Sequence, residues 1–394
     1  MVLDLGMQPP ANSYTRTEDE TVEEYPLGLN VCESCWHAQL TFCVDRQRIF
    51  DHYAYVSGTS STLKRFFKWF ATSLAAHLPV CARVLEIAAN DGSLIKQMQD
   101  AGIDCIGIDP ARNIVEKAQS EDLPVVCGYW PSASDKVPGQ FDAIVCMNVV
   151  AHVDDPKTFI NACREKLKPG GVLLVQPSQA RMFGNYEFDT CYHEHISFFN
   201  TRSINVLAQS VGLKLVGTAI VRIHGDSPIY LICHQDATAN PALLAAFSEG
   251  EFAIAEDLSD YEVKIRLFDW AIYDKFRAYA NSVVQALAEQ VANRREQGFT
   301  VVFVGAAAKA MTVVNAGRIR PDRFLDENPL KIGLRAPGIG TVIESIEVCR
   351  EIKQRAFFVI TAWNFRDELA LKLRATGLPH GSVIYSYFPR PGEL

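Results

Sequence analysis

The chain has 394 residues, of which 48% are hydrophobic and 21% are charged. This composition is typical of globular proteins, and the length predicts two or three domains. The net charge of −8 disfavours a general binder of nucleic-acid backbones, although an anionic small molecule could still bind in a local pocket.

The N-terminus shows no secretory signal, because it lacks a basic region, an apolar core and a small-residue cleavage site. No apolar run approaches the roughly 20 residues that span a bilayer. The 11 cysteines are scattered, and most lie in apolar runs, as reduced and buried cysteines do. We therefore expect a soluble, cytoplasmic protein that does not bind a membrane.

Residues 1–58 are expected to form a loop-rich N-terminal lobe, and residues 59–238 the next domain. A helix is predicted over 60–78, where apolar residues recur with a 3.6-residue period. Alternating elements follow, with strands at 83–87, 105–108, 143–147 and 171–176 and helices at 93–101, 111–120 and 156–167. This alternation predicts an α/β fold with a doubly wound parallel sheet. An antiparallel pair is predicted over 215–234, with its turn at 224–226.

Residues 239–394 are expected to hold a helical connector and a smaller, Rossmann-like α/β domain. The stretch 242–297 is rich in Ala, Glu and Leu, which favours helix. Further strands are predicted at 300–305, 356–361 and 381–387. Lys309 is predicted on the helix that follows the first of these strands.

The first motif with chemical meaning is the turn after strand 83–87. The strand carries Glu86 near its end, the turn leads into a helix, and the next strand ends in Asp109. Ligands bind at the carboxyl ends of parallel strands, where an acid can accept hydrogen bonds from a ribose. The turn lacks the Gly-x-Gly-x-x-Gly pattern that cradles a pyrophosphate, so a ligand with a cationic amino-acid end fits better. The alternative is an ordinary turn in which Asn90 or Asp91 caps the helix.

The second motif is a dense polar cluster between aromatic residues, Tyr192, His193, Glu194 and His195. In an extended chain, Tyr192 and Glu194 would face one way and the histidines the other. A carboxylate beside an imidazole can tune and orient a general base. A metal site shared by the two histidines and a plain polar loop are the alternatives.

Further along the sheet, the strand that starts at Asp142 and the Leu-Lys-Pro-Gly-Gly turn at 167–171 complete a pattern. Together they resemble class I S-adenosylmethionine-dependent methyltransferases. The resemblance implies that S-adenosylmethionine binds over this sheet edge. The residues expected to hold it are Glu86, Ala88, Asn90, Asp91, Gly92, Asp109 and Asn148. Ala88 departs from the family pattern, which has glycine there.

Nearly the whole chain resembles the sugar C-methyltransferases of deoxysugar pathways. The matching motifs lie at 4–9, 32–40, 53–57, 192–198, 224–225, 305–309, 326–331 and 362–364. The resemblance implies that a nucleotide-linked 4-keto-6-deoxysugar, with dTDP as the expected nucleotide, is methylated at C3, the carbon next to its ketone, to give a branched sugar. The nucleotide and the oligomeric state are left open.

The same resemblance places Tyr192, Glu194, His195, His152 and Tyr55 at the active site. Removing the sugar proton needs a base, and the resulting enolate needs a donor at its oxygen. We expect His195 to be the base, Glu194 its orienting partner, and Tyr192 or His152 the donor.

Substrate-binding residues are expected in two places. The first place is the turn at His224 and Gly225. The family usually has a second glycine and an arginine shortly after this pair, whereas this chain has Asp226 and Tyr230 there. In the C-terminal domain a helix N-terminus and Lys309 predict an anion site. Trp363 and Asn364 could face the sugar nucleotide or simply pack.

The family's N-terminal lobe closes a structural zinc site with two Cys-x-x-Cys pairs. This sequence supplies Cys32 and Cys35, and the first pair would fall before Leu3, so zinc binding stays open. Two other functions are also open: a non-catalytic binder of nucleotide sugars or of a partner protein, and an NAD-dependent oxidoreductase, which the missing glycine pattern disfavours.

Overall fold

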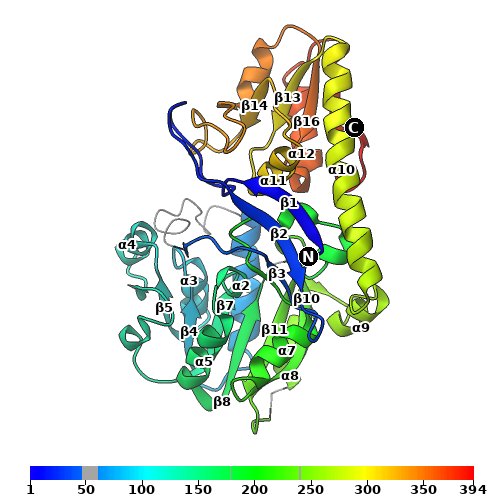
Figure 1. Cartoon of the computed structure of the whole chain (residues 1–394). Helices are drawn as coiled ribbons and strands as arrows, with labels where there is room; N and C mark the ends of the chain where they lie inside the picture. Colours follow the sequence, from blue (N-terminus) through cyan, green and yellow to red (C-terminus); the bar gives the residue numbers. More distant parts are fainter. Residues whose placement is uncertain (47–60, 178, 239–240) are drawn as a thin grey trace.

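The computed structural model describes residues 1–46, 61–177, 179–238 and 241–394, and it contains three β-sheets. In Figure 1 the eight-stranded sheet lies at the bottom, the six-stranded sheet at the top and a small four-stranded sheet between them. No described helix is long and apolar enough to cross a membrane.

The eight-stranded sheet has its parallel strands in the order of a doubly wound fold. In spatial order its strands are β12 (Ala253–Ile254), β10 (Leu213–Val221), β11 (Ser227–His234), β8 (Leu167–Gln176), β7 (Phe141–Met147), β4 (Arg83–Ile87), β5 (Asp104–Asp109) and β6 (Val125–Cys127). Neighbours from β8 to β6 are parallel, whereas β11 is antiparallel to both β8 and β10. The predicted parallel sheet and antiparallel pair are confirmed. The chain order reverses between β4 and β7, which is where such sheets bind ligands.

Helices cover both faces of this sheet, as predicted. Alternate strand residues point to opposite cores, with Val84 and Val145 in one and Leu85 and Ile144 in the other. The first core is covered by α2 (Ser61–Ala75), α3 (Ser93–Asp100), α4 (Arg112–Ser120) and α8 (Pro241–Phe247), and the second by α5 (Pro156–Lys166), α7 (Thr201–Gln209) and α9 (Leu258–Lys264).

The stretch 242–297 is not one helical connector, which corrects the prediction. α8 packs against α2 and β10, and β12 pairs with β10 at the edge of the large sheet. Only α10 (Trp270–Glu296) is a long helix, begun by Asp269, whose side chain accepts a hydrogen bond from the Ala271 backbone N–H at 3.0 Å. Its 27 residues correspond to about 40 Å, and Figure 1 shows it running alongside the upper sheet. Residues 241–264 therefore pack with the large sheet.

The six-stranded sheet forms the second α/β unit. Its strands are β15 (Ile343–Ser345), β14 (Arg323–Asp326), β13 (Thr300–Val304), β16 (Ala356–Ile360), β17 (Val383–Ser386) and β18 (Gly392–Glu393), all parallel except the last pair. Its helices are α11 (Ala308–Ala316) and α12 (Arg366–Ala375). Phe303 of β13 packs into a core shared with α10 and α11, and Phe358 of β16 into a separate core on the α12 side.

The four-stranded antiparallel sheet joins the two larger units. It consists of β1 (Leu3–Gln8), β2 (Tyr25–Val31), β3 (Ala38–Leu40) and β9 (Ser197–Phe198). β9 follows the polar cluster at 192–195 and pairs with β3. The N-terminal lobe therefore contacts the segment that carries the cluster. Leu29, Phe188 and Phe303 share one buried core, which joins the N-terminal sheet, the segment around η4 and the six-stranded sheet.

The remaining short elements are α6 (Met182–Asn185), η2 (Ser134–Lys136), η3 (Val150–His152), η4 (Phe188–Thr190), η5 (Ile346–Glu351) and η6 (Trp363–Phe365).

Candidate active site

The turn after β4 is held by the acid at the end of β5. Ala88, Asn90 and Gly92 have φ of 62°, 49° and 72°, so the turn bends through left-handed conformations. The Asp109 Oδ2 accepts a hydrogen bond from the Asn90 backbone N–H at 2.9 Å, and Oδ1 accepts one from Ala111 at 2.9 Å. Each carboxylate oxygen has two acceptor sites, so Asp109 can hold the turn and still accept hydrogen bonds from a ribose.

Two small residues explain the shape of this turn. Ala88 occupies a left-handed position that disfavours a side chain, which fits the glycine that the family resemblance implies there. Gly107 of β5 lies against the turn, and a Cβ added to it would come 2.5 Å from the Ala89 Cβ. Gly107 was not predicted, because the need for glycine becomes visible only when β5 and the turn after β4 lie against each other.

Buried polar atoms without partners gather where β4, β7 and β8 end. Among the described residues, Glu86 Oε2, Asn148 Oδ1 and both side-chain polar atoms of Gln176 have no hydrogen-bond partner. Burial, together with the charges of Asp109 and Asp91, raises the pKa of Glu86 well above its ordinary value. Buried polar groups are normally paired, so these atoms fit a polar ligand.

This set of groups suits S-adenosylmethionine, which carries an ammonium group and ribose hydroxyls. The acids Glu86 and Asp109 and the amides Asn148 and Gln176 would hold it at this edge. Gln176 was not predicted as a site residue, although a polar residue at the end of an apolar strand was a usable signal.

His195 is buried, and both of its ring nitrogens have partners. Nδ1 lies 2.9 Å from the Thr190 carbonyl oxygen and 3.0 Å from the Gln179 amide nitrogen, and Nε2 lies 2.9 Å from the Tyr192 hydroxyl. Burial and the neighbouring His152 hold the pKa of His195 well below its ordinary value. The ring is therefore neutral near pH 7, as a general base must be.

The segment around His195 is a turn rather than an extended strand. The His195 backbone N–H donates to the Tyr192 carbonyl at 2.8 Å, which brings the two side chains together. His193 packs instead against Tyr25 of the N-terminal sheet, with ring centroids 6.0 Å apart. The predicted facing of these side chains does not apply, because it holds only for an extended chain and this segment is a turn.

Among the described residues, the hydrogen bonds of Glu194 join it to Asn12 and His152 and not to His195, which differs from the contact we expected. Its Oε1 accepts a hydrogen bond from the Asn12 side chain at 2.5 Å, and its carbonyl oxygen lies 2.5 Å from His152 Nδ1. Burial raises the pKa of Glu194 to about 7, while Asn12 lowers it. The His152 and His195 rings lie 5.1 Å apart, so η3, which follows β7, links the cluster to the large sheet's carboxyl edge.

Lys309 reaches the cluster from the C-terminal domain. Its Nζ lies 3.7 Å from Glu187 Oε2 and 4.4 Å from the centroid of the Trp363 ring. Asp189 is buried nearby, and the Lys309 charge lowers its pKa although burial raises it overall. Two carboxylates thus surround one ammonium group. This arrangement favours ligand hydroxyls over the phosphate that we expected from sequence.

Trp363 and Asn364 differ in their surroundings. The Trp363 indole N–H donates to Asp189 Oδ2 at 2.5 Å, and its ring packs on Phe388 with centroids 4.5 Å apart. Asn364 is exposed. Of the two alternatives, facing the sugar nucleotide or packing, the contacts of Trp363 correspond to packing.

The turn with His224 and Gly225 lies beside Glu187. His224, Gly225 and Asp226 have φ of 52°, 81° and 63°, and a Cβ added to Gly225 would lie 3.5 Å from Glu187 Oε2. Arg181 Nε lies 3.1 Å from Asp226 Oδ2. The predicted hairpin turn is therefore brought next to the Lys309 group. Tyr230 is buried and donates to the Phe199 carbonyl at 3.2 Å, away from this turn.

The predicted zinc ligands form a tight turn. The Trp36 backbone N–H donates to the Cys32 carbonyl at 2.9 Å, and Cys35 follows in the same turn. Within the described residues, no group of three or more potential ligands is assembled. Two thiols do not fit a tetrahedral zinc site, which needs four ligands. Tyr55 lies outside the described residues.

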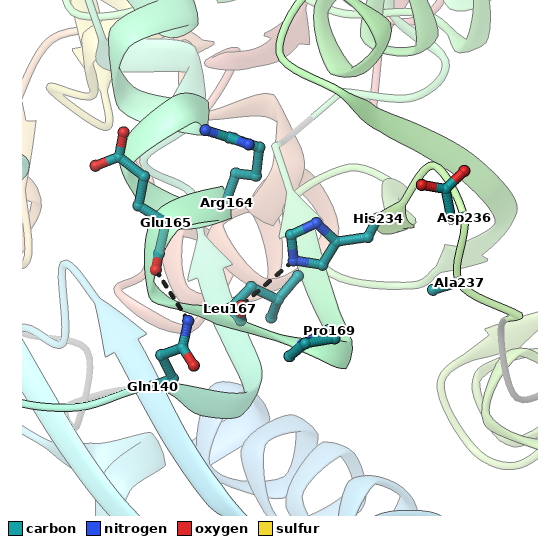
Figure 2. A pocket seen from close by; sticks show the side chains of 8 residues that line it. All are labelled: Gln140, Arg164, Glu165, Leu167, Pro169, His234, Asp236 and Ala237. Atoms are coloured by element: carbon teal, nitrogen blue, oxygen red, sulfur yellow. Dashed lines mark hydrogen bonds between the residues drawn. The ribbon is translucent and has the colours of Figure 1, made fainter.

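A separate hollow of about 470 Å³ lies at the opposite edge of the large sheet. Figure 2 shows it lined by the start of β8 and the end of β11, where His234 Nε2 lies 3.3 Å from the Leu167 carbonyl oxygen. Ligands of doubly wound sheets bind at the carboxyl edge, so this hollow is not the candidate site.

Comparisons with known proteins agree with this geometry. Three family models match in succession: "Putative zinc binding domain" over residues 1–50, "Methyltransferase domain" over 52–218 and "C-methyltransferase C-terminal domain" over 223–387. The C-methyltransferase NovU of Streptomyces niveus is 26% identical over 380 residues, covering 93% of this chain and 88% of that protein. The chain is therefore similar to C-methyltransferases over most of its length.

Other similarities cover less of the chain. A ubiquinone biosynthesis O-methyltransferase of Cereibacter sphaeroides is 38% identical over 111 residues, 27% of this chain and 45% of that protein. The structure of the CcbJ methyltransferase from Streptomyces caelestis has a TM-score of 0.39 and 14% identity, covering 48% of this chain and 99% of that one. A methyltransferase structure from Archaeoglobus fulgidus has a TM-score of 0.38 and 13% identity, covering 43% and 94%.

The protein is thus an S-adenosylmethionine-dependent C-methyltransferase. The roles of its individual site residues stay predictions.

Proposed function

We propose that this C-methyltransferase acts on a nucleotide-linked 4-keto-6-deoxysugar, at the carbon next to the ketone, C3. The observation that carries the proposal is the buried, neutral His195 beside the Tyr192 hydroxyl, linked through His152 to the carboxyl edge of β7. A carbon beside a ketone becomes a nucleophile once a base removes its proton. The arrangement provides that base together with a hydroxyl donor.

S-adenosylmethionine, when bound at this edge, supplies a methyl group on a sulfonium centre. The Tyr192 hydroxyl, which donates to His195 Nε2 before the substrate binds, turns to donate to the ketone oxygen that becomes the enolate oxygen. His195 Nε2 is then free to take the proton from C3. Held by Glu86 and Asp109, S-adenosylmethionine would give its methyl group to the enolate carbon and leave as S-adenosylhomocysteine. His195 finally returns the proton to solvent. Such a base contributes about 10²–10⁴-fold to the rate.

The neighbouring groups support a sugar as the ligand. Glu187 Oε2 and Asp189 Oδ1 are buried without hydrogen-bond donors among the described residues, and Lys309 lies beside Glu187. Such a set pairs well with sugar hydroxyls, which both donate and accept. His152 donates its Nδ1 proton to the Glu194 carbonyl oxygen, so Tyr192 is the better candidate for the enolate donor.

The test is a reaction of the full chain with S-adenosylmethionine and a dTDP-4-keto-6-deoxyhexose in deuterated water. Mass spectrometry should show addition of a methyl group, and NMR should place it on C3. His195→Asn should abolish both methylation and deuterium uptake at C3, whereas Glu86→Gln should weaken methylation and keep the uptake. Methylation on oxygen, or His195→Asn at the wild-type rate, would contradict the proposal.

A further inference from the structure

Asp189 is a buried carboxylate that joins two domains, and its second oxygen, Oδ2, does a different task from the Oδ1 that faces the proposed sugar site. It lies in η4 and is fully buried. Its Oδ2 accepts hydrogen bonds from the Trp363 indole N–H at 2.5 Å and from the Tyr387 hydroxyl at 3.0 Å. Both donors belong to the C-terminal domain, so Asp189 fixes η4 to that domain.

The next residue along the chain touches the candidate base. The Thr190 carbonyl oxygen lies 2.9 Å from His195 Nδ1. The same stretch is held a second time, because the Thr312 hydroxyl of α11 donates to the Cys191 carbonyl at 3.3 Å. The position of the Thr190 carbonyl therefore depends on contacts with the C-terminal domain.

Two groups of opposite character meet at His195 Nδ1. The Thr190 carbonyl can only accept, which favours a proton on Nδ1, whereas the Gln179 amide nitrogen, 3.0 Å away, can only donate, which favours a bare Nδ1. Only the first tautomer leaves the Nε2 lone pair available to accept a proton. The balance between Thr190 and Gln179 thus decides whether His195 is in its basic form.

We propose that Asp189 is a positioning residue: by anchoring η4 to Trp363 and Tyr387, it keeps the Thr190 carbonyl on His195 Nδ1 and so selects the tautomer with a free Nε2. The C-terminal domain then contributes to the chemistry through this anchor. The inference rests on the proposed role of His195 as base, but the tautomer itself can be measured without any substrate.

The experiment is ¹⁵N NMR of the full chain labelled at its nine histidines, with His195 assigned from the His195→Gln variant. In the wild type we expect His195 to carry its proton on Nδ1. In Asp189→Asn the anchor is weakened, because a neutral amide oxygen accepts the hydrogen bonds of Trp363 and Tyr387 less strongly than a carboxylate oxygen does. The proton should then move largely to Nε2, with Gln179 donating to Nδ1.

A double variant and a matched control sharpen the test. Asp189→Asn combined with Gln179→Met removes the competing donor and should return the proton to Nδ1. Glu262→Gln is the control, since Glu262 is equally a buried carboxylate, but its partner, the Thr201 backbone N–H at 2.9 Å, lies at the start of α7 and not in η4. Its His195 signals should match the wild type.

Kinetics provide the second readout. Asp189→Asn should lower kcat about 10–100-fold, with little change in the KM for S-adenosylmethionine, and Gln179→Met should restore part of it. If Asp189→Asn does not fold, Trp363→Phe removes one donor and keeps the ring, and it should shift the tautomer in the same direction. An unchanged His195 tautomer in these variants would overturn the proposal. An altered tautomer with no activity on any keto sugar would instead count against the proposed function.

Discussion

Glu194 lies in the turn that carries His195. Its ionisation is controlled by burial. Burial raises the pKa of Glu194 to about 7, and the pKa of His195 is held well below its ordinary value. Only Glu194 should therefore titrate near neutrality in this turn. An ionised Glu194 would oppose the negative charge of an enolate, so kcat/KM should fall as the pH rises through about 7.

The measurement is the pH profile of kcat/KM for the wild type and for Glu194→Gln. The glutamine is close in shape, keeps an oxygen for the Asn12 side chain and cannot ionise, so the limb near pH 7 should disappear. Asn12→Ala removes the one hydrogen bond that lowers this pKa and should move the limb to higher pH. A limb that survives in Glu194→Gln would assign it to another group.

Ala88 offers a test of backbone strain at the cofactor turn. Its φ of 62° is a left-handed conformation, which costs an L-residue about 1–2 kcal/mol. Glycine removes this strain but loses about 0.5–1 kcal/mol through its greater freedom when unfolded. Ala88→Gly should thus raise the free energy of unfolding by up to about 1 kcal/mol, measured by urea denaturation without S-adenosylmethionine.

The adjacent alanine is the matched control. Ala89 is buried, does not have a positive φ, and packs closely against Gly107. Ala89→Gly should therefore lower the free energy of unfolding by about 0.5–1 kcal/mol. If both variants change stability in the same direction, strain at position 88 is not the cause.

At the scale of elements, one arginine ties together three segments around the β10–β11 turn. Arg181 Nε lies 3.1 Å from Asp226 Oδ2, and its Nη2 lies 2.8 Å from Glu256 Oε2, between β12 and α9. Arg181→Met would leave two partly buried acids facing each other. We expect a loss of about 1–2 kcal/mol in the free energy of unfolding, since all three side chains keep some exposure to water.

The double variant Arg181→Met/Glu256→Gln separates pairing from packing. Removing the second acid should recover part of the loss, as a double-mutant cycle in 50 mM and 500 mM salt would show. Additive losses that do not depend on salt would contradict an electrostatic role for Arg181.

Sequence patterns predicted the regular elements well and the interruptions poorly. The strand at 83–87 was predicted with the bounds it has in β4, because a buried strand followed by an acidic turn is a local signal. β12 was missed, since a two-residue strand at a sheet edge leaves no period to detect. The same holds for the turn at Tyr192–His195, where a contact across the turn replaced the assumed alternation.

The candidate site divides in the same way. Glu86, Asp109 and His195 could be proposed from sequence because each belongs to a short motif. Asn12, Gln179 and Asp189 could not, because their partners Glu194, His195 and Trp363 lie on other segments. Hydrogen bonds between distant segments become visible only once the domains are packed.

At the scale of the whole molecule, one core connects the N-terminal sheet, the active-site segment and the C-terminal domain. Leu29 of β2, Phe188 of η4 and Phe303 of β13 belong to it. The C-terminal sheet has a second core on its other face, which includes Phe358. These two cores should respond differently to the same type of substitution, because only the first contains residues of the active-site segment.

Phe276 and Phe358 allow this comparison. Both are fully buried, and Phe276 of α10 packs against Phe183 of α6 with ring centroids 5.0 Å apart. Replacing either by alanine should lower the free energy of unfolding by about 3–5 kcal/mol. The fall in Tm should be similar in the two variants. At a temperature where both variants remain folded, Phe276→Ala should lose considerably more kcat than Phe358→Ala, because α6 leads directly into η4. Equal losses of kcat would mean that the shared core stabilises the fold without positioning the active-site segment.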